Sequence, residues 1–170
     1  MEVTVFNKEW AVLFEEEAEK IKYIFGENLI SIDHIGSTSV AGLKAKPIID
    51  IMPVVKNIYL VDQNNEEMQK LGYEPMGEFG IAGRRYFRKG QEKRTHHVHI
   101  FQEGSPDIKR HIAFRDYLRA HPNLRDRYGA LKSKLAEQFP FDKESYINGK
   151  DALVKEIEAQ ALEWFDAISK

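Results

Sequence analysis

Residues 34–51 read HIGSTSVAGLKAKPIIDI, and the fold prediction rests on this stretch. A short apolar strand is expected over 29–35, and a turn rich in glycine, serine and threonine follows over 36–43. The run 47–55 is β-branched and apolar on both faces, which is typical of a central strand. Asp50 interrupts this run, and a buried carboxylate is costly unless it is paired, hydrogen-bonded or bound to a metal ion. The stretch therefore predicts a functional carboxylate beside a hydroxyl-rich turn.

The turn at Gly36 has the composition of a phosphate-binding loop. Glycine lets a phosphate group approach the backbone closely, and successive amides can donate hydrogen bonds to it together with the hydroxyls of Ser37, Thr38 and Ser39. A structural interpretation is equally open, in which the turn is simply tight and nearby hydroxyls or amides satisfy Asp50.

Hydrophobic periodicity and turn residues predict the elements outside this stretch. Helices are expected over 8–25, ending at Gly26, and over about 57–71. Three further strands are expected near 73–77, 84–89 and 96–102, and helices at about 107–120, 122–138 and 142–168. Pro47 and Pro53 are expected to limit the central strand. The order predicts a single α/β (α+β) domain over 1–170, with a mixed sheet in about 1–105 and a helical part in about 106–170.

Composition excludes several classes of protein. The chain of 170 residues has no cysteine, so disulfides and thiolate metal sites are excluded. No apolar run approaches the roughly 20 residues of a membrane helix, and the first residues lack the basic start of a signal peptide. The formal net charge of −2 gives no long-range attraction to nucleic acid or anionic lipid. We expect a cytoplasmic protein whose partner is a small molecule.

Histidines alternate with apolar residues in the run HHVHIF at 96–101. In a strand, His97 and His99 share one face, and the intervening apolar residues share the other. If this strand lies beside the strand of Asp50, the three side chains form a two-histidine, one-carboxylate site that suits Zn²⁺, Mn²⁺ or Fe²⁺ better than Mg²⁺. The alternative is a pair of histidines that only hold loop backbone by hydrogen bonds.

Several long stretches match the GrpB family: residues 34–51, GYEPMGEFGIAGRRYFRK (72–89), HHVHIF (96–101) and HIAFRDYLRAHP (111–122), with Tyr146 and Lys150 further along. Over about 30–155 the chain resembles this family, whose members are assigned to the nucleotidyltransferase fold. The pattern of Gly36-Ser37, a spacer and then Asp50 between apolar residues is similar to the pattern of that superfamily. The resemblance implies transfer of a nucleotidyl group from a nucleoside triphosphate to an acceptor. It also implies a divalent metal ion (Mg or Mn, with Zn as an alternative) held by Asp50, assisted by His97 or His99.

One position departs from the superfamily pattern. A second acid usually follows the first by two residues, so that both carboxylates face a pair of magnesium ions. Here that position is Met52, and Asp50 alone cannot build such a clamp. Either a histidine completes the metal site, or the protein is a non-catalytic nucleotide- or anion-binding module. A metal-dependent hydrolase using His97 and His99 is a third alternative.

Two other histidine-based enzyme classes fit the sequence poorly. A histidine-triad nucleotide hydrolase has a third alternating histidine, where this chain has Phe101. An adenylyltransferase with the motif HIGH has a second histidine, where this chain has Ser37.

The remaining candidates for binding phosphate are basic: Lys46, Arg85, Arg115 and Lys150. Arg84 and Arg85 lie on opposite faces of a strand, so at most one of them faces a cleft, and a solvated edge-strand charge is the alternative. Arg115 follows His111 by one helical turn, and lies either in a polar stripe toward the site or on a solvent face. Lys150 interrupts the apolar stripe of the last helix, so its ammonium group either reaches water or meets an anion.

Overall fold

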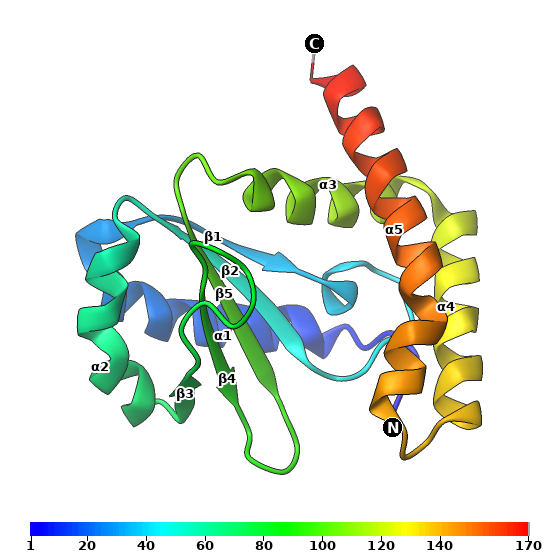
Figure 1. The fold of residues 1–170 in the computed structure, drawn as a ribbon, viewed down its shortest axis with the longest axis horizontal. Helices are drawn as coiled ribbons and strands as arrows, with labels where there is room; N and C mark the ends of the chain where they lie inside the picture. The colour runs from blue at the N-terminus through cyan, green and yellow to red at the C-terminus, as the bar shows by residue number, and fades with distance from the viewer. Residues whose placement is uncertain (170) are drawn as a thin grey trace.

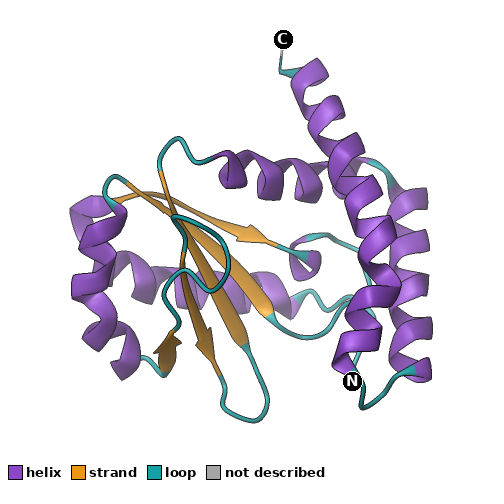
Figure 2. Cartoon of the chain, in the orientation of Figure 1, coloured by secondary structure: helices purple, strands orange, loops and turns teal. Residues whose placement is uncertain are grey.

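The computed structural model describes residues 1–169, and the run with Asp50 forms a central strand of its sheet, β2 (Ile49–Val55). The sheet order is β1-β2-β5-β4-β3, and only β2 and β5 are parallel neighbours. The other strands are β1 (Leu29–Ile35), β3 (Tyr73–Pro75), β4 (Arg85–Lys89) and β5 (His96–Gln102). The fold is therefore a mixed α/β fold, as predicted (Figure 1, Figure 2).

One face of the sheet is apolar and is covered by α1 (Glu9–Phe25). The buried positions of this helix recur at three- and four-residue steps, which places them on one stripe toward the strands. Ile49, Ile51 and Val55 of β2, together with Val98 and Ile100 of β5, complete this core. Gly26 ends the helix with a φ of 53° and begins the short 3₁₀ turn η1 (Gly26–Asn28). Alternation along the strands then directs the intervening side chains to the opposite face.

The opposite face is polar at one end and apolar at the other. Asp50 and His97 lie near the beginnings of β2 and β5. Met52 and Phe101 lie farther along and pack against the apolar residues of α3 (Pro106–Ala120). Packing on α3 therefore accounts for the apolar end of this face, while the functional candidates gather at the other end.

Two further helices, α4 (Pro122–Gln138) and α5 (Lys143–Ile168), stand side by side near the end of β1 (Figure 1). They share a hydrophobic cluster with the segment that follows the 3₁₀ turn η2 (Ser37–Ser39). Val40 and Leu43 of that segment are fully buried in the cluster. The turn predicted to bind phosphate is thereby fastened to the helical part of the molecule.

The structure corrects two expectations about individual elements. The helix predicted over 57–71 is a 3₁₀ segment, η3 (Ile58–Asn64), followed by the short α2 (Asn65–Lys70); two adjacent asparagines at the junction have low helix propensity. Pro53 lies inside β2 rather than at its end. Pairing of β2 with β5 is interrupted between Ile51 and Val54, so the missing N–H of Pro53 falls where that ladder is open.

Within residues 1–169, no helix has an apolar stretch long enough to cross a membrane.

Candidate functional site

Asp50, His97 and His99 converge on the sheet face opposite α1. The parallel register of β2 and β5 places Asp50 directly beside His97. His99 Nε2 lies 3.0 Å from Asp50 Oδ1, and His97 Nδ1 lies 3.5 Å from the same oxygen. The side chains are partly open to solvent, with exposed fractions of 25% for Asp50, 24% for His97 and 14% for His99. The strand of Asp50 therefore lies beside the strand of His97 and His99, as the hypothesis of a shared site required.

The two imidazoles keep Asp50 ionised. Burial acts to raise the pKa of Asp50, but hydrogen bonds from His97 and His99 outweigh it and hold the pKa well below its usual range. A permanent negative charge therefore stands at this end of the sheet.

Arg84 determines which nitrogen of His99 carries a proton. Arg84 Nη1 lies 3.4 Å from His99 Nδ1, and a guanidinium can only donate. Nδ1 must then accept, so the proton of the neutral ring resides on Nε2 and is donated to Asp50. Arg84 is 8% exposed and is also held by the carbonyl of Phe79 at 2.8 Å. The arginine is therefore built into the loop that precedes β4.

The three side chains fit one metal ion in number and spacing. One donor atom from each lies within 4.8 Å of the others, and ligand atoms at about 2.1 Å from a tetrahedral ion are about 3.4 Å apart. Two imidazoles and one carboxylate suit a transition metal better than Mg²⁺. The contact with Arg84 opposes metal binding. A metal ion on His99 Nε2 would leave the ring proton on Nδ1, where this N–H would face the N–H donors of the guanidinium. Binding thus requires Arg84 to release His99.

Gly36 brings the η2 turn against Asp50. Its φ of 72° lies in the region that favours glycine, and a Cβ at this position would stand 2.5 Å from Asp50 Oδ2. Ser37 follows, and its Oγ accepts a hydrogen bond of 2.8 Å from Lys132 Nζ. Backbone strain and close approach therefore both require glycine here.

The other two hydroxyls of the turn are engaged within the protein. Thr38 Oγ1 lies 2.9 Å from His34 Nε2, and Ser39 Oγ donates to the carbonyl of Gly36. Both residues are buried. Thr38 still lines the cleft described below, but Ser39 lines a separate hollow, contrary to its predicted place at the phosphate site.

A cleft of about 220 Å³ opens beside the turn, and we call it the lysine cleft. Its polar lining includes Ser37, Lys46, Asp50, Lys132, Tyr146 and Lys150. The lysines come from three places in the chain: the loop before β2, helix α4 and helix α5. The predicted residues Lys46 and Lys150 are thus brought to Asp50, together with a lysine that was not predicted.

These lysines are partly desolvated and repel one another. Burial and the nearby Lys150 lower the pKa of Lys132 to about 7, and burial with Lys150 and Lys143 lowers the pKa of Lys46 to about 8. Burial also lowers the pKa of Lys150, although Asp50 acts to raise it. Within residues 1–169, no carboxylate lies within ion-pair distance of any of these four lysines. The cluster therefore favours an anionic ligand.

Arg85 and Arg115, both predicted to bind phosphate, lie outside the cleft. Arg85 shares the sheet face of Ile100 and forms a bidentate pair with Asp62, with Nε–Oδ1 at 2.7 Å. Arg115 donates to Asp33 and to the carbonyl of His34, which ties α3 to β1. Each guanidinium is engaged by a carboxylate of its own and is not aimed at the site.

Sequence reasoning missed Lys132, and it weighed Arg84 and His111 without selecting either as a site residue. Lys132 lies between Tyr128 and Leu135 on the buried stripe of α4, so the gap in an apolar stripe that identified Lys150 would have identified it as well. Nothing in the sequence indicates whether Arg84 or Arg85 faces the site, because this depends on the residue at which β4 begins.

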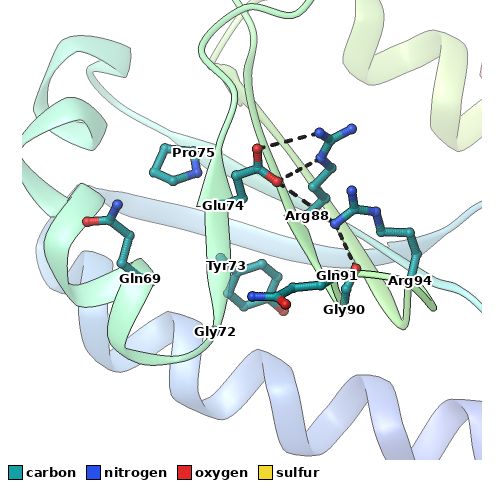
Figure 3. Close-up of a pocket in the computed structure, with 9 residues that line it drawn as sticks. All are labelled: Gln69, Gly72, Tyr73, Glu74, Pro75, Arg88, Gly90, Gln91 and Arg94. Atoms are coloured by element: carbon teal, nitrogen blue, oxygen red, sulfur yellow. Dashed lines mark hydrogen bonds and ion pairs between the residues drawn. The ribbon is translucent and has the colours of Figure 1, made fainter.

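A further hollow lies at the edge of the sheet, beside β3 and the β4–β5 turn (Figure 3). Its two arginines converge on one carboxylate, since Arg88 Nε lies 3.1 Å and Arg94 Nη1 lies 3.9 Å from Glu74 Oε2. Arg94 also donates to the carbonyl of Gly90 at 2.7 Å. Glu74 pairs with both guanidinium groups and leaves this hollow one net positive charge, whereas the lysine cleft also has several lysines outside ion-pair distance of any carboxylate in residues 1–169.

Comparison with known proteins identifies the family. The family model described as "GrpB protein" matches residues 1–160. The UPF0157 protein YqkA of Bacillus subtilis is 51% identical over 164 residues, which are 96% of this chain and 48% of that protein. The chain thus spans about half the length of this curated relative.

Two solved structures extend the comparison. The conserved protein GrpB from Enterococcus faecalis superposes with a TM-score of 0.94 at 49% identity, over 96% of this chain and 99% of that chain. The Cid1 poly(U) polymerase with MgGTP bound has a TM-score of 0.55 at 16% identity, over 79% of this chain and 44% of that chain. The likeness to Cid1 shows the fold alone, which is that of nucleotidyltransferase polymerases. With the family model and the near-complete superposition in agreement, the chain belongs to the GrpB family.

Proposed function

We propose that this chain transfers a nucleotidyl group from a nucleoside triphosphate to an acceptor, with the triphosphate bound in the lysine cleft. One observation carries the proposal: the cluster of Asp50, His97 and His99 adjoins a cleft that also presents lysines with no carboxylate partner within residues 1–169. Phosphoryl chemistry depends mostly on positioning and on stabilising negative charge, and this cleft offers both. The fold likeness supports the proposal but does not establish an activity.

Each residue has a role in this proposal. Asp50, His97 and His99 hold a divalent metal ion, with Mn²⁺ or Zn²⁺ favoured over Mg²⁺, which when bound supplies positive charge at a phosphoryl oxygen. Ser37 and Thr38, which line the cleft, orient the phosphates. Lys46, Lys132 and Lys150 neutralise the phosphate oxygens, as the three lysines together carry more charge than Asp50 removes.

A non-catalytic nucleotide- or anion-binding module is the second candidate, and two observations favour it. Met52 is fully buried against Ile35 and Phe101, so the place of the second carboxylate is part of the apolar core. The Arg84 contact with His99 favours the metal-free tautomer. Both features suit a protein that binds a polyanion without reacting it.

Thermal unfolding with each of the four nucleoside triphosphates, with and without Mn²⁺ or Mg²⁺, tests the proposal. A ligand at 100 times its dissociation constant stabilises the folded state by about 2.7 kcal/mol. We expect metal-dependent stabilisation of the wild type that is lost in Asp50→Asn and retained in Asp62→Asn, whose carboxylate pairs with Arg85 outside the cleft.

The released product separates the candidates. Pyrophosphate formed together with a nucleotidylated product supports transfer, whereas stabilisation without any product supports the binding module. Release of inorganic phosphate alone would indicate a hydrolase. No stabilisation by any triphosphate would contradict both transfer and nucleotide binding.

A further inference from the structure

A second cleft, of about 230 Å³, lies between the end of β1 and the helices α3, α4 and α5. We call it the helix cleft. Besides Asp50, its lining includes Arg110, His111, Phe114, Tyr128 and Glu158. None of these five residues lines the lysine cleft.

The two clefts share one wall, formed by Ser37, Asp50 and Lys150. A transfer reaction needs two substrate sites that meet at the reacting phosphorus, because donor and acceptor must be held within bonding reach of each other. A wall common to two clefts, with a carboxylate and a lysine in it, supplies such a meeting point. The lysine cleft is the donor side on this arrangement, which leaves the helix cleft for the acceptor.

The charges of the two clefts differ sharply. Five basic side chains and one carboxylate line the lysine cleft: Lys46, Arg94, Lys132, Lys143 and Lys150, with Asp50. The helix cleft has two of each sign: Arg110 and Lys150, with Asp50 and Glu158. The lysine cleft therefore selects a polyanion, and the helix cleft does not.

Two details reinforce the neutral character of the helix cleft. Arg110 is compensated, as its guanidinium lies 3.2 Å from Asp107 and 3.6 Å from Glu158. Phe114 and Tyr128 meet edge to face at 6.1 Å and supply an apolar wall. The helix cleft therefore has too little positive charge to neutralise the phosphates of a nucleic-acid backbone.

We propose that the helix cleft binds the acceptor, and that the acceptor is a compact molecule with a hydroxyl or amine nucleophile and no net negative charge, rather than a nucleic-acid end. This inference rests on the proposed nucleotidyl transfer. The acceptor oxygen or nitrogen forms a bond to the α-phosphorus, and the bond from that phosphorus to the bridging oxygen breaks. Pyrophosphate leaves with the electron pair, and the acceptor proton passes to water in the open cleft.

The test uses radiolabelled ATP (α-³²P) with Mn²⁺ and two kinds of acceptor probe. The small probes are L-serine, ethanolamine and glucosamine, and the nucleic-acid probe is an oligoadenylate. Val154→Trp fills the helix cleft, since Val154 lines it and not the lysine cleft. Ile147→Trp is the matched control, because Ile147 is 43% exposed on the same helix and lines neither cleft. Thermal stabilisation by ATP is measured on every variant.

We expect label in a small product, a fall of about 100-fold in its formation with Val154→Trp, and no change with Ile147→Trp. Stabilisation by ATP should persist in all variants. Label transferred to the oligoadenylate, equal transfer by Val154→Trp, or ATP binding without label in any small probe would each overturn the acceptor assignment. If none of the four nucleoside triphosphates stabilised the wild type, the proposed function itself would be overturned.

Discussion

Asp50 and His99 form a hydrogen-bonded pair, and Arg84 determines that His99 is the donor in it. The guanidinium faces His99 Nδ1 at 3.4 Å, and the opposite nitrogen donates to Asp50 at 3.0 Å. In most protein metal sites the outer nitrogen of a histidine ligand donates to an acceptor, which stabilises the metal-bound tautomer. Here the outer partner is a donor, so the contact of Arg84 with His99 Nδ1 favours the tautomer that a metal ion on Nε2 would displace.

Replacing Arg84 by glutamine should therefore strengthen metal binding. The amide oxygen of glutamine can accept from Nδ1–H, which is the arrangement that a metal-bound His99 needs. We expect the affinity for Mn²⁺ or Zn²⁺ to rise about tenfold in Arg84→Gln, measured by competition with a fluorescent chelator.

Arg84→Lys is the control for this variant, because it keeps a donor-only cation and should show no gain. The melting temperature of each variant reports whether the loop held by Arg84 has stayed folded. Equal metal affinity in the wild type and in a folded Arg84→Gln variant would show that Arg84 does not regulate the cluster.

Lys132 gives a pH dependence whose sign follows from its burial. Its pKa falls from the usual 10.5 to about 7, so between these values the unfolded chain binds a proton that the folded protein does not. Stability contributed by this site therefore rises as the pH increases through that range, and is lowest below about 7. Replacing Lys132 by methionine removes the dependence. We expect the stability of Lys132→Met relative to wild type to fall by about 2 kcal/mol between pH 6 and pH 9, measured by urea denaturation.

Lys134→Met is the matched control for the pH experiment. Lys134 is exposed on the same helix, so its replacement should leave the pH profile of the wild type intact. A constant difference between wild type and Lys132→Met at both pH values would mean that Lys132 remains well solvated in the folded state.

At the scale of elements, local patterns predicted the strands and the helices except that over 57–71, but they did not predict which strands are neighbours. Alternation in the run 96–101 placed His97 and His99 on one face, and this holds in β5. Their meeting with Asp50 depends on β2 and β5 being neighbours, which no local pattern encodes. The choice of Arg85 over Arg84 failed for a similar reason, since one residue of strand register reverses the face of a side chain.

Gly36 is the position of the η2 turn where a side chain would be opposed by both backbone strain and close contact. Gly36→Ala meets both a positive φ of 72° and a contact of 2.5 Å with Asp50, whereas Gly77→Ala meets a φ of 61° with nothing within 4 Å. We expect a loss of about 2–3 kcal/mol for Gly36→Ala and of about 1 kcal/mol for Gly77→Ala in urea denaturation. Equal losses would show that Asp50 moves aside without cost.

At the scale of the whole molecule, the lysine cleft lies at the junction between the sheet and the helices α4 and α5. Asp50 belongs to the sheet, while Lys132 and Lys150 belong to α4 and α5. Without an anion the lysines repel one another across this junction. A multivalent anion in the cleft should therefore fasten the helices to the sheet and slow local opening in both.

Hydrogen exchange with inorganic pyrophosphate measures this coupling directly. We expect slower exchange in α4, in the first half of α5 and in β2 together, with no change in β3, which lies at the far edge of the sheet. Lys150→Ala should abolish the effect, because it removes the lysine common to both clefts. Sodium chloride at matched ionic strength controls for screening, which acts on all surface charges alike. Protection confined to the helices would mean that the anion does not reach Asp50, and the sheet and the lysines would then act as separate sites.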